Sequence, residues 1–310
     1  MQATPPGQAT CAALSGRFRE PLPGTAAVAR SWLCLEQRGP WGHHALTQSH
    51  LDPDLGRALD RAAGAAGVRV QLIRRPGRHA DEPPSGPRRV YLAHTGPGAS
   101  WLRTADVTDP ADLLALDFDA IGRGRHGGWG RAVAEPLMLI CTNGRRDRCC
   151  AILGRELVAE LADRHGDTIW ETTHTGGHRF APAAVVLPSG YTYGRLRGHD
   201  ADGALSAAAA GKLVLDHCRG RSTWSRRGQV AELAVREHVG EYLVDALRVS
   251  SEDGDRVHVE HQDGRTWDVT VQEHELDPPR PNSCGAAAVR PTTFVAVGVS
   301  GSPEQDRRPS

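Results

Sequence analysis

The stretch Leu137-Met-Leu-Ile140, followed by Cys141-Thr-Asn-Gly-Arg-Arg-Asp-Arg-Cys149-Cys150, decides the fold prediction. Its four apolar residues predict a central β-strand that is covered on both faces. Apolar residues then recur at helical spacing, which predicts a helix over residues 149–164 with Asp147 as its N-cap. Gly144 permits the tight turn between strand and helix. A strand followed by a helix predicts an α/β fold, in which ligands bind where such strands end.

A second stretch, His174-Thr-Gly-Gly-His178, follows a predicted strand at residues 168–172. In a parallel arrangement this strand ends beside the strand that precedes Cys141. Gly176 and Gly177 disfavour a continuous helix, so we expect the histidines on a tight loop that directs both imidazoles to one centre. Thiolates and imidazoles bind borderline metals well, and the sequence therefore predicts a metal or cluster site.

The predicted elements occur twice in the same order, which is strand, helix, three strands and helix. The first set begins near Ala29 and the second at Leu137. We interpret this order as an internal duplication, with two unrelated α/β segments as the alternative. The remaining chain predicts a helix at residues 229–238 and two or three strands between residues 243 and 272. The predicted organisation is a flexible N-terminus (1–24), two α/β domains (25–130 and 131–222), a small α+β appendage (223–300) and a disordered tail (301–310).

Composition excludes several classes of function. The chain has 310 residues, and its 37 Lys and Arg balance its 37 Asp and Glu, so no nucleic-acid partner is indicated. No apolar run approaches the roughly 18 residues of a membrane span, and no signal-peptide pattern is found at the N-terminus. Seven irregularly spread cysteines argue against a disulfide framework. We therefore expect a cytoplasmic protein without a membrane partner, in which clustered cysteines bind metal or carry redox chemistry.

The paired motifs resemble a known family. Cys-x7-Cys-Cys with Arg-Asp before the paired cysteines, followed by His-x-Gly-Gly-His-Arg-Phe-Ala, is similar to the sucrase/ferredoxin-like family, and residues 21–25, 36–42 and 280–285 resemble it as well. The resemblance implies a thioredoxin-like ferredoxin domain that holds a [2Fe-2S] cluster through two cysteines and two histidines. From this resemblance together with the repeated element order, we interpret the first domain as a similar, metal-free thioredoxin-like companion. The implied ligands are Cys141, Cys150, His174 and His178.

One position departs from the family pattern. Eukaryotic relatives resemble Cys-x8-Cys with a basic residue before the second cysteine, where this chain has Cys149. The spacing therefore selects Cys150, and Cys149 is a neighbour or an alternative ligand. Arginines near the site can favour a reduced, anionic centre or bind an acidic redox partner, although in an arginine-rich chain most are solvated or structural. The residues expected to surround the ligands are Gly144, Arg146, Asp147, Gly177 and Arg179.

The functional prediction is an electron-transfer protein with a [2Fe-2S] cluster and an unknown redox partner protein. Because a bound imidazole can lose its remaining ring proton in the oxidised state and regain it on reduction, we expect proton-coupled electron transfer. A zinc-stabilised Cys2His2 binding protein without redox function is the alternative, since it has the same ligands. A thioredoxin-type thiol enzyme is disfavoured, because no Cys-x-x-Cys occurs.

An electron carrier is favoured over an enzyme, and enzymatic activity is left open. The word sucrase in the family label has no support from these residues, because no carboxylate pair has the spacing of a glycoside hydrolase. Outside the motifs, Cys34 in a predicted strand and Cys218 at the end of a helix predicted over residues 203–218 are expected to pack as small hydrophobic residues. The adjacent His43 and His44 are expected to be loop residues, and Cys284 is expected to pack near the cluster.

Overall fold

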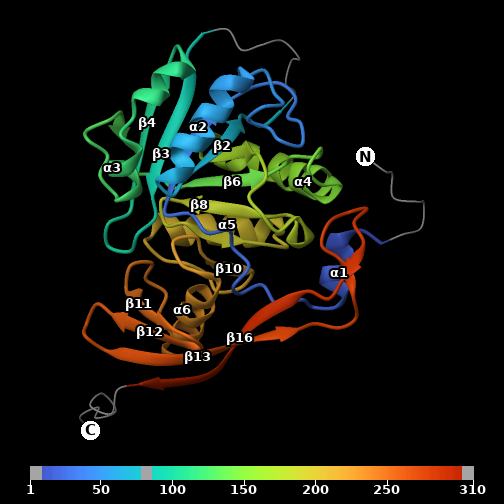
Figure 1. The fold of residues 1–310 in the computed structure, drawn as a ribbon, viewed down its shortest axis with the longest axis vertical. Coiled ribbons are helices and arrows are strands. Elements are labelled where there is room, and N and C mark those ends of the chain that lie inside the picture. The colour runs from blue at the N-terminus through green and yellow to red at the C-terminus, as the bar shows by residue number, and fades with distance from the viewer. Residues whose placement is uncertain (1–8, 78–85, 302–310) are drawn as a thin grey trace.

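The computed structural model describes residues 9–77 and 86–301, and Figure 1 shows how they are arranged. A ten-stranded mixed sheet forms the centre of the molecule, and a four-stranded sheet and a two-stranded sheet follow it in the chain. Helices pack against the two larger sheets. The α/β fold predicted from the sequence is confirmed. Within residues 9–77 and 86–301, none of the helices has the length and apolar character needed to cross a membrane.

The second half of the large sheet contains the stretch quoted first above. β6 (Leu137–Cys141) is buried along its whole length and pairs in parallel with β7 (Ile169–Thr172). The helix between them is α4 (Arg148–His165). β8 (Ala184–Leu187) pairs antiparallel with β6, and β9 (Tyr191–Tyr193) pairs antiparallel with β8. The half is completed by α5 (Gly198–Ala209) and β10 (Cys218–Arg221).

The first half repeats these pairings. β1 (Ser31–Glu36) pairs in parallel with β2 (Val68–Arg74), and α2 (Pro53–Ala65) connects them. β3 (Arg88–His94) pairs antiparallel with β1, and β4 (Trp101–Val107) pairs antiparallel with β3. The expected second helix is present as the 3-10 helix η1 (Pro110–Ala115) and the short α3 (Phe118–Gly122). The short β5 (Arg131–Ala132) pairs with β4. The element order predicted twice is therefore found in both halves.

The two halves join through β2 and β7, which pair antiparallel at Ile73–Thr172 and Arg74–Glu171. The resulting strand order is β10-β9-β8-β6-β7-β2-β1-β3-β4-β5. Apolar clusters cover the sheet, and the continuous apolar pattern of β6 reflects burial on both faces, as predicted. Because the halves share one sheet, the predicted domain boundary at residue 130 and the thioredoxin-like classification stay predictions.

Two sequence predictions need correction. The helix expected to reach Cys218 ends at Ala209, because Gly211 follows with a φ of 69° and stops it, and Cys218 instead begins β10. The N-terminus was expected to be flexible, yet residues 9–24 include helix α1 (Cys11–Arg17), in which Cys11 is buried. Contacts with distant segments override the polar local sequence there. Residues 1–8, and residues 302–310 of the predicted tail, lie outside the described residues.

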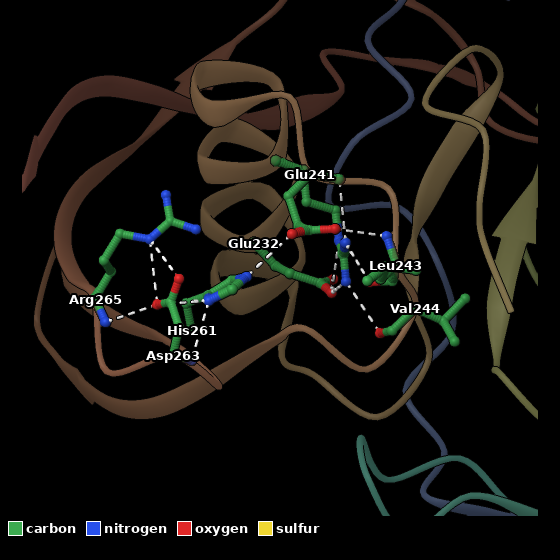
Figure 2. Close-up of polar contacts among 8 residues, drawn as sticks. Glu232, Glu241, Leu243, Val244, His261, Asp263 and Arg265 are labelled. Atoms are coloured by element: carbon green, nitrogen blue, oxygen red, sulfur yellow. Dashed lines mark hydrogen bonds and ion pairs between the residues drawn. The ribbon is translucent and has the colours of Figure 1, made fainter. Parts of the chain in front are cut away.

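The C-terminal appendage consists of helix α6 (Arg226–Val239) and a four-stranded antiparallel sheet. Its strands are β11 (Leu247–Asp253), β12 (Arg256–His261), β13 (Thr266–Glu275) and β16 (Thr292–Gly301). The first three agree with the two or three strands predicted between residues 243 and 272, and β16 lies beyond that range. Glu232 and Arg236 of α6 form a buried ion pair at 3.0 Å, and Figure 2 shows Glu232 among the polar contacts of this region. Tyr191 of β9 donates to Glu232, which connects the appendage to the large sheet.

Between β13 and β16 the chain leaves the appendage and runs to the N-terminal helix α1. Its short strands β14 (Arg280–Pro281) and β15 (Ala288–Val289) lie beside α1, as Figure 1 shows. Arg280 donates to the buried carboxylate of Glu20 at 3.2 Å, and Arg179 donates to the same carboxylate at 2.6 Å. Segments near both ends of the described chain therefore meet beside the loop that carries the predicted histidine ligands.

Candidate metal centre

The predicted site begins where β6 and β7 end. Cys141 is the last residue of β6 and pairs with Thr172, the last residue of β7, and His174 follows two positions later. On the other side, α4 begins at Arg148 with Asp147 as its N-cap, whose Oδ1 accepts the Cys149 N–H at 2.8 Å. The predicted cap is confirmed. The ends of two adjacent strands and the start of one helix therefore converge at one edge of the sheet.

Cys141, Cys150 and His174 are brought together, with one ligand atom from each lying within 4.8 Å of the others. The two cysteines are buried and His174 is half-buried. His178 falls outside that group, but its ring centroid lies 5.0 Å from that of His174. The structure thus gathers all four predicted ligands around the ends of β6 and β7.

The two cysteines of this group differ in their acidity. A hydrogen bond with Cys150 lowers the pKa of Cys141 well below its usual value, although burial acts in the opposite direction, and His174 lowers it further. The same hydrogen bond, together with burial, raises the pKa of Cys150. These interactions favour the thiolate form of Cys141. Thiolate is the form that binds metals, so the group already favours one such ligand.

The histidine loop turns through two glycines. Gly176 and Gly177 have φ angles of 93° and 71°, in the left-handed region that favours glycine. A Cβ atom on Gly177 would lie 2.2 Å from Nη2 of Arg219, whose Nη1 donates to the Gly176 carbonyl oxygen at 3.0 Å. Arg69 donates to the His174 carbonyl oxygen at 2.8 Å. The predicted tight loop is confirmed, and two arginines fix its backbone.

The ring nitrogens of the histidines are suited to a ligand role. Nδ1 of His174 and Nδ1 of His178 are buried, and neither has a hydrogen-bond partner within residues 9–77 and 86–301. Nε2 of His178 lies 3.8 Å from Oδ2 of Asp147. Burial lowers the pKa of His178, although the nearby Asp147 carboxylate acts in the opposite direction. A buried ring nitrogen without a hydrogen-bond partner is available to bind a metal, so both histidines fit that role.

Cys149 does not join this group. Its Sγ lies 3.6 Å from Sγ of Cys11 and 3.3 Å from Sγ of Cys284. A hydrogen bond from Cys11 lowers the pKa of Cys149 to about 6, against the effect of burial. The two adjacent cysteines therefore belong to different groups. Cys150 lies with Cys141, and Cys149 lies with a second group of sulfur atoms, those of Cys11 and Cys284. Sequence reasoning missed this second group, and its one signal was the family-like stretch at residues 280–285.

Two of the surrounding residues shape the start of α4. Burial raises the pKa of Asp147, but N–H donation from Cys284 and Cys149 outweighs it and holds that pKa below its usual value. Asp147 is therefore a fixed, buried carboxylate. Gly144 allows the turn before α4 to pack closely, because a Cβ atom there would lie 2.6 Å from Cβ of Ala151.

The two predicted arginines differ in role. Arg179 donates to the buried Glu20 at 2.6 Å, so its charge is neutralised by a structural ion pair. Nη1 of Arg146 lies 3.0 Å from Nδ1 of His43, which belongs to the loop after β1. Both of these residues and His174 line a cavity of about 680 Å³. The expected loop position of His43 is confirmed, and the loop contributes to the approach to His174.

Comparison with known proteins now identifies the family. A family model described as sucrase/ferredoxin-like matches residues 22–220, which is more than half of the chain. The chain belongs to the sucrase/ferredoxin-like family. The resemblance read from the motifs is thus confirmed, and the sucrase/ferredoxin-like region includes the four predicted ligands but neither Cys11 nor Cys284. No curated protein and no solved structure matches the chain. In this sucrase/ferredoxin-like protein, Cys141, Cys150 and His174 form a group that can hold a metal.

Proposed function

We propose that this protein is an electron carrier in which Cys141, Cys150, His174 and His178 hold a [2Fe-2S] cluster. The observation that carries the proposal is the meeting of two buried thiols with two imidazoles whose Nδ1 atoms are buried and, within the described chain, unpaired. These donors are of the types that iron–sulfur centres with mixed ligands use. The ferredoxin-like description of the family supports the same conclusion.

The spacing of the donor atoms favours a cluster over a single zinc ion. Ligand atoms of a tetrahedral zinc lie about 3.3–3.8 Å apart, given zinc–ligand distances of about 2.0–2.3 Å. Here three donors lie within 4.8 Å of one another, and His178 falls outside that group. A two-iron cluster distributes its ligands over two metal ions, so the four donors need not converge on one point.

The residues around the ligands suit a role in proton-coupled electron transfer. When bound, such a cluster would take up and release one electron, and Rieske-type centres do so at about −150 to +300 mV. With Nδ1 as the ligand atom, His178 holds its ring proton at Nε2, 3.8 Å from Oδ2 of Asp147. That carboxylate is fixed by the N–H groups of Cys149 and Cys284, each at 2.8 Å. A proton held there can leave when the site loses an electron.

The cavity beside His174 suits the approach of a redox partner protein. Its lining includes three arginines and a single carboxylate, that of Asp60, so the basic side chains outnumber the acidic one. A partner with an acidic surface would be attracted to this opening and brought close to the half-buried imidazole. The arginines that line the cavity are Arg57, Arg69 and Arg146.

Iron and acid-labile sulfide analysis, combined with a visible spectrum, tests the proposal. We expect about two irons and two sulfides per chain in the wild-type protein, and we expect both to be lost in Cys141→Ala. The matched control is Cys34→Ala, which removes a buried thiol from β1 in the other half of the sheet and should leave the iron content unchanged. A colourless wild-type protein that contains zinc bound through Cys141 would overturn the proposal and support a zinc-stabilised binding protein.

A further inference from the structure

Three cysteines from distant parts of the chain meet beside Asp147. Cys11 belongs to α1, Cys149 to the first turn of α4, and Cys284 to the segment between β14 and β15. Their sulfur atoms form a triangle with sides of 3.6, 3.3 and 3.5 Å. Cys11 and Cys149 are buried, and Cys284 is partly buried. All three are free thiols, so the triangle is not a product of disulfide bonding.

The dimensions of this triangle fit one metal ion. A disulfide would bring two sulfurs to about 2.05 Å, well below the separations observed. A two-iron cluster distributes four ligands over two irons, whereas here the three sulfurs and a carboxylate oxygen all lie within 4.8 Å of one another. A tetrahedral zinc ion with zinc–sulfur distances of about 2.3 Å places its sulfur ligands about 3.8 Å apart. The observed separations are slightly shorter than this value, so a small outward movement would accommodate the ion.

Asp147 supplies a fourth donor atom in a suitable position. Its Oδ2 lies 3.6 Å from Sγ of Cys11, and its ligand atom lies within 4.8 Å of all three sulfurs. The carboxylate is fully buried and oriented by the N–H groups of Cys149 and Cys284 and by the hydroxyl of Ser283. A divalent ion would compensate the negative charge of thiolates and a carboxylate that are buried together.

We propose that Cys11, Cys149, Cys284 and Asp147 bind a structural zinc ion, at a site separate from the proposed [2Fe-2S] ligands. Two of these residues, Cys11 and Cys284, lie outside the residues that match the family model. The ion connects α1 and the segment after β14 to the N-terminus of α4, which joins positions up to 273 residues apart. It also holds Asp147, the carboxylate that faces His178. The zinc site thus fixes the environment of the neighbouring centre.

Elemental analysis of the full-length protein, prepared from cells supplied with both zinc and iron, tests the proposal. We expect about one zinc ion per chain in the wild-type protein. Cys284→Ser should lower the zinc content at least tenfold and leave the iron content unchanged. Cys141→Ala should do the reverse, with iron lost and zinc retained. Cys218 is a buried thiol that belongs to neither group. Cys218→Ala is therefore the control, and it should keep both metals.

The wild-type measurement alone can refute the site, because it does not depend on a variant that folds. The absence of zinc from the wild-type protein would overturn the proposal, as would thiol mapping that finds a disulfide between two of Cys11, Cys149 and Cys284. Zinc that disappears in Cys141→Ala but stays in Cys284→Ser would place the ion at the other group and also refute it. A protein with zinc but without iron would refute the electron-carrier proposal and leave the zinc site intact.

Discussion

The two halves of the large sheet have the same strand pairings, yet their strand ends carry different chemistry. In the second half, β6 ends at Cys141 and β7 leads to His174. In the first half, β1 ends at Glu36 and β2 ends at Arg74. The pairing pattern of the strands therefore does not decide what a sheet of this type binds. The residues that follow each strand decide it.

The first half uses its strand ends to form an ion pair. Nε and Nη2 of Arg74 donate to Oε2 of Glu171 in β7, at 2.9 and 2.7 Å, and both side chains are buried. Nη1 donates to the carbonyl oxygen of Gly39 at 2.8 Å, and the guanidinium lies 4.1 Å from the centroid of the Trp41 ring. One half thus gathers soft donor atoms, and the other uses charge and an aromatic ring to anchor the junction of the halves.

The largest effect is expected from removing a histidine from each half. His174→Ala should reduce the iron content more than tenfold, because it removes a donor from the buried group. His44→Ala in the loop after β1 should leave the iron content unchanged. Iron analysis of both purified variants checks this prediction. Equal loss of iron from the two variants would show that the first half contributes a ligand and would break the contrast between the halves.

The next effect concerns the imidazole itself. His178→Cys replaces a neutral ligand with an anionic thiolate, which stabilises the oxidised state of the cluster. The coloured centre should persist, and its reduction potential should fall toward the value of about −400 mV found for plant-type ferredoxins. Potentiometric titration followed by the visible spectrum measures the shift. An unchanged potential would show that His178 is not a ligand.

Local patterns were sufficient to predict the second half of the sheet. The apolar run of β6, the helical spacing after it and the Asp147 cap are signals within a few residues, and all appear in the structure. The helix predicted over residues 203–218 ends instead at Ala209, because Gly211 stops it, and Cys218 begins a strand. A single local signal of this kind is easily outweighed by the pattern around it.

Contacts between distant residues could not be predicted in this way. Cys11 and Cys284 reach Cys149 through the packing of α1 and of the segment after β14, which no spacing in the sequence encodes. The Arg74–Glu171 pair likewise depends on which strands meet at the junction of the halves. The ligand residues of the second half could be predicted from the sequence, because the ends of adjacent parallel strands lie together in any such sheet.

A smaller effect is expected from breaking the anchor of the first half. Arg74→Ala removes a buried guanidinium that pairs with the Glu171 carboxylate, so the free energy of unfolding should fall by about 3–5 kcal/mol. Arg75→Ala is the adjacent control, because its pair with Asp167 is exposed and should contribute about 1 kcal/mol or less. Denaturant unfolding measures both. Equal losses of unfolding free energy in the two variants would contradict the structural role assigned to Arg74. A folded Arg74→Ala protein that has lost its iron would contradict it as well.

The smallest effect concerns the proton of the second half. If the His178 ring loses its Nε2 proton in the oxidised state, reduction takes that proton up, and the potential should fall by about 59 mV per pH unit above the pKa of the oxidised site. A potential that is constant between pH 6 and pH 10 would contradict proton coupling. The negative charge of Asp147 favours the protonated ring. Asp147→Asn keeps an oxygen acceptor for the helix cap but removes that charge, so the sloping region should begin at a lower pH than in the wild-type protein.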